Sequence, residues 1–227
     1  MVKAMDKDGN KLLLEKFHTF CEVNPLEFQE EQLKKVEDDI IKPRNGVVSD
    51  EYVDFILWTK GLKTRQEYFA EYVEKLFPQE TYHKLLEVGC GRTARLSELL
   101  AAKGYQMWAM DPQVDMQVVQ EGVEEHNISC IKTHFTFEKT DITEFDGIIA
   151  QEPCEATEHI IRECVAKKKD FVISLCGVEH RLMNGEMPED VFTWYHYLEE
   201  IGGDNCTLVR PKLIPGIMSH VMIGMFS

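Results

Sequence analysis

The segment from Lys84 to Gln113 constrains the fold of this chain more than any other part of the sequence. An apolar run, Leu85-Leu86-Glu87-Val88, leads directly into Gly89-Cys90-Gly91, and a helix-forming stretch follows. Glycine at the first position permits a tight turn, and glycine at the second lets the backbone approach a ligand that a side chain would exclude. The segment therefore predicts a strand, a glycine turn and a helix.

The ligand of this turn is suggested by two carboxylates. The next apolar run, Gln106–Met110, ends in Asp111, and a carboxylate at a strand tip can accept hydrogen bonds from both hydroxyls of a ribose. Gly-x-Gly followed by Ala94 also fits a dinucleotide-binding turn. Glu87 argues against a dinucleotide, because an anion two residues before the first glycine would repel a pyrophosphate and would suit a ligand with an ammonium group.

After Pro78, short apolar runs alternate with helical stretches, which indicates a parallel sheet with helices on both faces. The last two apolar segments, Thr207–Leu213 and Ser219–Phe226, are joined too closely for a crossover helix, so we expect an antiparallel pair. N-terminal to the sheet we expect helices over 25–41 and 50–77, the second interrupted at Gly61. The other predicted strands are 85–88, 106–110, 129–132, 147–150 and 171–175, with helices over 95–103, 114–125, 155–166 and 188–200.

The run from Glu87 to Gly91, with Asp111 at the end of the next strand, resembles the first two motifs of the class I S-adenosylmethionine (SAM)-dependent methyltransferases. The resemblance implies a doubly wound α/β fold, with a mostly parallel seven-stranded sheet, helices on both faces, an antiparallel last strand and an N-terminal helical cap. We expect the cap to span residues 1–80 and the SAM-binding domain residues 81–227. The implied activity is methyl transfer from SAM.

The resemblance also implies which residues bind the cofactor. The glycine loop would pack against the methionine part of SAM with Glu87 supporting it, and Asp111 would hold the ribose. Arg65 of the cap would pair with the cofactor's carboxylate, and Tyr68 would cover its methyl group. The predicted cofactor-binding residues are Glu87, Gly89, Cys90, Gly91, Asp111, Pro112, Gln151, Arg65 and Tyr68.

The adenine contact departs from the family pattern. Many members carry an acid after the third strand, whereas this chain reads Ile131-Lys132-Thr133-His134-Phe135 there. We therefore expect adenine to stack on Phe135 or to meet the backbone.

The loop after the fourth strand, Gln151-Glu152-Pro153-Cys154, faces the reacting methyl group in this family. It lacks the signature of the amino-group methylases of nucleic acids, Asp or Asn followed by two prolines and an aromatic residue, which argues against base methylation. Glu152 could align or deprotonate an acceptor, or it could only favour the N-terminus of the following helix. His180, after the fifth strand, is the second predicted catalytic residue, although a lone loop histidine is more often simply solvated.

The sequence does not predict a metal site. Cys154, Glu158 and His159 have spacings that could gather on one helix face, but no further ligand pair accompanies them. The seven cysteines stand singly, without a C-x-x-C pair, as expected of free thiols in a reducing cytoplasm.

Charge and hydropathy restrict the partners. With 40 acidic and 25 basic side chains the formal net charge is −15, which opposes a broad phosphate-binding face. No segment is apolar over the roughly 18 residues of a membrane span. We therefore predict a cytoplasmic methyltransferase with a small-molecule substrate, neutral or cationic, and with neither nucleic acid nor membrane as partner. The alternative is a non-catalytic or regulatory protein that keeps the fold and works through partner contacts.

Overall fold

The structure, a computed structural model, describes residues 7–23, 34, 36, 37, 40, 50–117, 119, 128–213 and 219–226. The predicted helix over 25–41 and most of the predicted helix over 114–125 lie outside these residues. The chain divides into two compact units, Met1–Arg65 and Gln66–Ser227. None of the described helices has the length and apolarity that crossing a membrane requires.

The first unit contains helices α1 (Lys7–Val23) and α3 (Asp50–Thr59). Aromatic rings dominate its core: Phe17 meets Phe55 edge-on, with 5.2 Å between the ring centroids, and Phe20 packs against both. The predicted interruption of the 50–77 helix is confirmed. Gly61 follows α3 with φ +64°, a conformation that glycine adopts at little cost.

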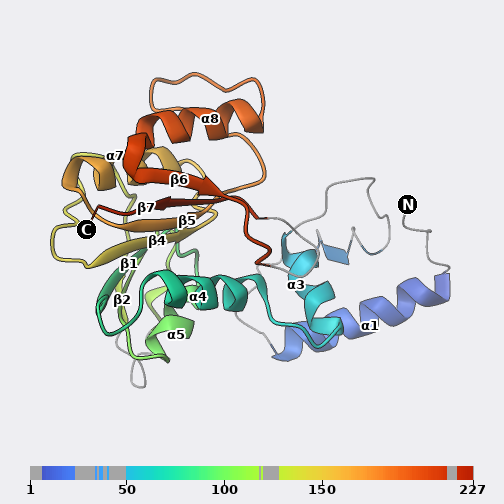
Figure 1. Cartoon of the computed structure of the whole chain (residues 1–227). Coiled ribbons are helices and arrows are strands. Elements are labelled where there is room, and N and C mark those ends of the chain that lie inside the picture. The colour runs from blue at the N-terminus through green and yellow to red at the C-terminus, as the bar shows by residue number, and fades with distance from the viewer. Residues whose placement is uncertain are drawn as a thin grey trace. The chain divides into compact units, whose positions relative to one another are not determined.

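The second unit is a seven-stranded sheet of order β3-β2-β1-β4-β5-β7-β6 (Figure 1). Strands β1 to β5 run parallel. β7 lies between β5 and β6 and runs antiparallel to both, which confirms the predicted fold class and its antiparallel last strand. The strands are β1 (Lys84–Val88), β2 (Gln106–Met110), β3 (Ile128–Ile131), β4 (Gly147–Gln151), β5 (Phe171–Ser174), β6 (Cys206–Val209) and β7 (Val221–Gly224).

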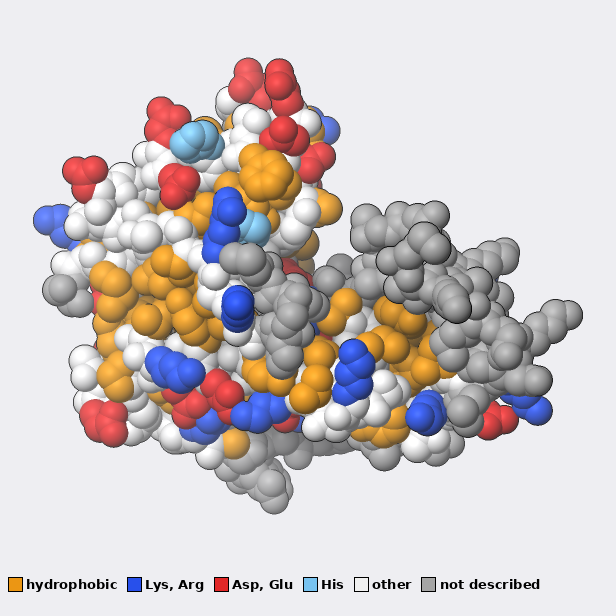
Figure 2. All heavy atoms as spheres, turned by 45° about the vertical axis from the view of Figure 1, so that its right-hand side comes forward, with side chains coloured by type: hydrophobic (Ala, Val, Ile, Leu, Met, Phe, Trp, Pro, Cys, Tyr) orange, Lys and Arg blue, Asp and Glu red, His pale blue; other side chains and the backbone are white. Residues whose placement is uncertain are grey.

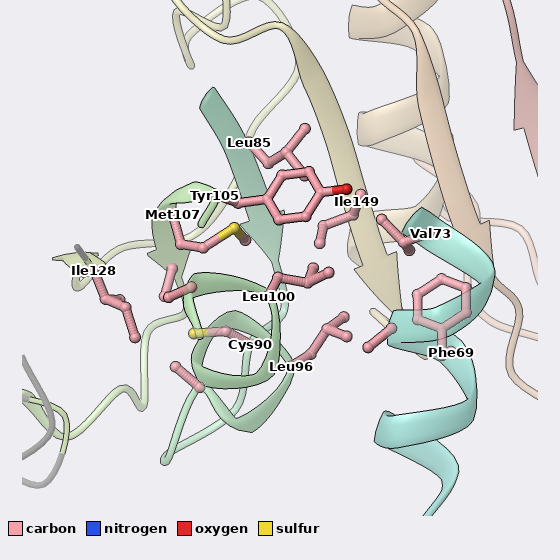
Figure 3. Close-up of a cluster of buried hydrophobic side chains, with 14 of the residues drawn as sticks. Phe69, Val73, Leu85, Cys90, Leu96, Leu100, Tyr105, Met107, Ile128 and Ile149 are labelled. Carbon is pink, nitrogen blue, oxygen red and sulfur yellow. The ribbon is translucent and has the colours of Figure 1, made fainter. Parts of the chain in front are cut away.

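Helices cover both faces of the sheet. On one face, Leu85 of β1 belongs to an apolar cluster with Phe69 of α4 (Arg65–Leu76) and Leu100 of α5 (Arg95–Ala101), as Figure 3 shows. The next strand residue, Leu86, points to the opposite face and belongs to a cluster with Ile161 of α7 and Trp194 of α8. The helices of this unit are α4 (Arg65–Leu76), α5 (Arg95–Ala101), α7 (Ala156–Lys167), α8 (Val191–Gly202) and the short 3₁₀ helix η1 (Gly203–Asn205).

Candidate functional site

A cavity of about 720 Å³ lies at the carboxyl ends of β1, β2, β3 and β4. β1 and β4 are neighbours in the sheet, yet the chain leaves β1 for β2 and β3 before it returns to β4. In open α/β sheets, ligands bind where the strand order reverses in this way. The cavity is lined by Val88, Gly89, Met110, Asp111, Pro112, Gln113, Thr133, His134, Phe135, Thr136, Pro153, Cys154, Glu155, Ala156, His159 and His180.

The two glycines of the turn after β1 have different surroundings. Gly89 has φ +74°, and a Cβ there would lie 3.0 Å from Cα of Pro153, so the loops after β1 and β4 touch. Gly91 has φ +66°, but a Cβ there would meet no atom within 4 Å. No protein atom therefore crowds Gly91, although it is Gly89, confined by Pro153, that is among the residues lining the cavity.

Asp111 is held in place by the backbone around it. Its Oδ2 accepts a hydrogen bond from the amide of Gly91 at 3.1 Å, and its Oδ1 accepts one from the amide of Gln113 at 2.7 Å. A carboxylate oxygen has two lone pairs, so each keeps one for a further donor. Asp111 and Pro112 both line the cavity, as their predicted role requires.

Glu87 lies behind the glycine loop and is not among the residues that line the cavity. Its Oε2 accepts hydrogen bonds from the amide and from the hydroxyl of Ser97, in the first turn of α5. Burial raises the pKa of this carboxyl to about 7, against the lowering effect of those hydrogen bonds. The geometry favours the supporting role of the prediction, with Glu87 fixing α5 to the strand that carries the loop.

The other predicted cofactor residues, Gly91 included, are not among the residues that line the cavity. Cys90 is buried, and its thiol donates to the carbonyl of Gly91 at 3.4 Å. Gln151 is half-buried at the end of β4. Arg65 forms an ion pair with Asp54, at 3.3 Å between Nε and Oδ2, and Tyr68 is half-buried on α4.

The loop after β4 has an unusual backbone. Glu152 and Cys154 flank Pro153, and both have φ +52°, which costs a residue with a Cβ about 1 to 2 kcal/mol. Such conformations cluster at functional sites. The amide of Glu152 donates to the carbonyl of Ser174 at 2.8 Å, and Cys154 is turned toward the cavity that it lines, whereas Glu152 is not a lining residue.

His180 lines the same cavity. Burial lowers the pKa of its imidazole, which favours the neutral form. Its ring packs edge-on against Trp194, with 5.1 Å between the centroids. Nε2 of His180 is buried and has no hydrogen-bond partner among the described residues.

The grouping of Cys154 with Glu158 and His159 that the sequence suggested does not form. The Glu158 carboxylate is engaged elsewhere, by the Tyr197 hydroxyl at 2.6 Å and the Arg162 Nε at 2.8 Å. Nδ1 of His159 accepts from the amide of Phe137 at 3.2 Å.

Several lining residues were not predicted as site residues, among them His134, Thr136 and His159. The signal that could have found the first two is their position directly after β3, because the carboxyl ends of parallel strands meet at one edge of the sheet. Phe135, which the sequence offered as a stacking surface for adenine, is buried and lines the cavity.

The sequence matches no family model and no curated protein. Its structure resembles those of several methyltransferases. Magnesium protoporphyrin IX methyltransferase from Synechocystis PCC 6803 with bound S-adenosylhomocysteine is 11% identical, with 93% of this chain and 100% of that chain covered and a TM-score of 0.52. The same enzyme with bound SAM is 13% identical over 100% of both chains, with a TM-score of 0.51.

A SAM-dependent methyltransferase from Leishmania major is 13% identical over 76% of each chain, with a TM-score of 0.50. At such low identity the likeness concerns the fold. The strand order, the antiparallel β7 and the position of the cavity agree with it. This chain has the Rossmann-like fold of the class I SAM-dependent methyltransferases.

Proposed function

We propose that the protein binds SAM in the cavity at the strand ends and transfers its methyl group to a small molecule. The observation that carries the proposal is the pairing of Gly91 and Asp111. An open backbone and a carboxylate stand at one edge of the sheet, joined by a hydrogen bond of 3.1 Å. The methionine part of SAM would lie against the loop from Gly89 to Gly91, its ribose hydroxyls would donate to Asp111, and adenine would stack on Phe135.

The surroundings of α5 favour SAM over a dinucleotide. A dinucleotide places its pyrophosphate at the N-terminus of the helix after the glycine turn. Here the Glu87 side chain already accepts a hydrogen bond from the amide of Ser97 in the first turn of that helix, at 2.9 Å. The methionine end of SAM carries an ammonium group, which the Asp111 carboxylate at the cavity would attract rather than repel.

A small acceptor agrees with the size of the cavity and with the charge of the chain. Ligand cavities in proteins measure about 300 to 1,000 Å³, and this one has about 720 Å³. On the face of the molecule shown in Figure 2, Lys and Arg side chains are interspersed with acidic, apolar and uncharged ones. The formal net charge of −15 supports a neutral or cationic acceptor rather than a nucleic acid.

Methyl transfer places modest demands on the protein. A lone pair of the acceptor attacks the methyl carbon in line with the breaking carbon–sulfur bond, whose electrons remain on the sulfur of S-adenosylhomocysteine. The enzyme must align the two molecules and, for a protonated acceptor, remove a proton. Glu152 and His180 are the predicted catalytic residues, and His180 borders the cavity.

The alternative is a regulatory protein that binds the cofactor without turnover. The two are separated by incubating the protein with methyl-labelled SAM and fractions of a metabolite extract, and by measuring S-adenosylhomocysteine formed. We expect one fraction to raise its formation above the rate without acceptor, and the Asp111→Ala variant to lose this increase. Cofactor binding with no such increase from any fraction would favour the regulatory protein.

A further inference from the structure

Two cysteines and one histidine come together at the edge of the cavity. Cys154 follows β4, while Cys176 and His180 follow β5, the neighbouring strand. One ligand atom from each, the two sulfurs and a ring nitrogen, lie within 4.8 Å of one another. Cys154 is exposed, Cys176 is buried and His180 is half-buried, so the cluster lies between the core and the cavity.

The separation of the two sulfurs matches the edge of a zinc tetrahedron. Sγ of Cys154 and Sγ of Cys176 are 3.8 Å apart. Two thiolates bound to one zinc ion at ~2.3 Å with tetrahedral angles would be about 3.8 Å apart. A disulfide requires about 2.05 Å, so the sulfurs would have to approach by about 1.7 Å to form one.

The histidine lacks the partner that a buried ring nitrogen usually has. Nε2 of His180 is buried without a hydrogen-bond partner among the described residues, and such groups are rare in folded proteins. Three carboxylates, those of Glu152, Glu155 and Glu179, lie close enough to act electrostatically on the cluster. Their charge favours a bound cation.

We propose that Cys154, Cys176 and His180 bind a zinc ion at the edge of the cavity. Two cysteines and one histidine are a ligand set that zinc accepts, and three protein ligands leave a fourth position open. Cys154 and His180 line the cavity, so that position would be available to a water molecule or to an atom of the substrate. In this arrangement His180 would bind the ion and would not act as a base. A role of the bound ion toward a methyl acceptor rests on the proposed function.

Cobalt binding tests the site without SAM. The purified protein is reduced, freed of metal with a chelator and titrated with Co²⁺, which replaces zinc and absorbs visible light. We expect one Co²⁺ per chain, visible bands of a tetrahedral ion and a near-ultraviolet band from thiolate-to-cobalt charge transfer. One equivalent of Zn²⁺ should abolish all of these bands.

Variants locate the bound ion. Cys154→Ser changes an exposed side chain and should weaken Co²⁺ binding at least tenfold, as should His180→Ala. Cys206→Ser, which replaces a half-buried cysteine of the same unit, is the matched control and should bind like the native protein. Zn²⁺ should also slow the alkylation of Cys154 in the native protein, measured by mass spectrometry.

Three results would overturn the proposal: no Co²⁺ bound, Co²⁺ bound without the charge-transfer band, or an affinity of Cys154→Ser for Co²⁺ equal to that of the native protein. Alkylation of Cys154 at the same rate with and without Zn²⁺ would also contradict it and would leave a hydrogen bond between two thiols as the reading of the 3.8 Å contact. None of these results depends on whether the protein binds SAM. Evidence against the zinc site would therefore not count against SAM binding. Evidence against SAM binding would likewise not count against the zinc site.

Discussion

Glu87 places a carboxyl group inside the protein, where water does not reach it. The side chain is 3% exposed, and burial raises its pKa from the ordinary value of 4.5 to about 7. Between those pH values the folded state keeps a proton that the unfolded state has released. The contribution of Glu87 to stability is therefore full below pH 4.5 and is lost as the pH rises through 7.

Replacing Glu87 by Gln should remove this pH dependence, because Gln stays neutral and keeps an oxygen that Ser97 can reach. Relative to the native protein, the free energy of unfolding of Glu87→Gln should rise by up to about 3 kcal/mol between pH 4.5 and pH 8. Denaturant unfolding at several pH values measures the difference. Glu189→Gln, at an exposed position of the same unit, should show no such trend. If the free energies of unfolding of Glu87→Gln and of the native protein changed equally with pH, the raised pKa assigned to Glu87 would be contradicted.

Asp111 is the second residue with a specific expected effect. Asp111→Ala should weaken the binding of S-adenosylhomocysteine by about 1 to 3 kcal/mol, because hydrogen bonds to the ribose are lost. Calorimetry measures the affinity, and unfolding measurements check that the variant is folded. Asp204→Ala, at an exposed position in η1, is the control. An unchanged affinity in Asp111→Ala would refute the role in ribose binding.

At the scale of elements, the loops after β1 and β4 pack against each other. Gly89 touches Pro153 and Gly91 does not, although both have a positive φ. Gly89→Ala should lower the free energy of unfolding by about 2 to 4 kcal/mol, through backbone strain and overpacking together. Gly91→Ala should cost only about 1 to 2 kcal/mol from strain and should abolish cofactor binding. Equal losses of stability, or normal binding by Gly91→Ala, would contradict this division of roles.

The ends of a strand could be predicted from the sequence where residues on both sides of it mark them. β2 was predicted to the residue, because an apolar run is closed by Gly104 on one side and by Asp111 on the other. β6 ends at Val209, earlier than predicted, and Pro211 two residues later has no amide hydrogen to offer a ladder.

The candidate site could be predicted only in part. Asp111, which lines the cavity, could be proposed from the sequence because it ends a recognisable strand next to a glycine turn. The cluster of Cys154, Cys176 and His180 was not found, because its members come from two loops that only the pairing of β4 with β5 brings together. The contact between Gly89 and Pro153 likewise depends on the pairing of β1 with β4, which no local sequence pattern predicts.

At the scale of the whole molecule, the chain divides at Arg65, so that nearly all of α4 belongs to the sheet unit. Phe69, Val73 and Phe77 are at most 1% exposed and pack in the cluster with β1 and α5. Burying a side chain of this size contributes about 1.5 to 3 kcal/mol, and a typical protein is stable by only about 5 to 15 kcal/mol.

Two shortened chains test this division. Residues 63–227 keep α4 and should unfold cooperatively on heating, followed by circular dichroism. Residues 81–227 begin at the predicted domain boundary, lose all three side chains, and should be unfolded or much less stable. Equal melting temperatures for the two chains would show that α4 is not part of this core.

The central claim, that the cavity at the strand ends is a SAM site, is tested most directly by calorimetry of the native protein with S-adenosylhomocysteine. We predict that one molecule binds per chain, that SAM competes with it, and that a nicotinamide dinucleotide does not. No measurable binding of either SAM or S-adenosylhomocysteine, or displacement of both by the dinucleotide, would contradict the claim.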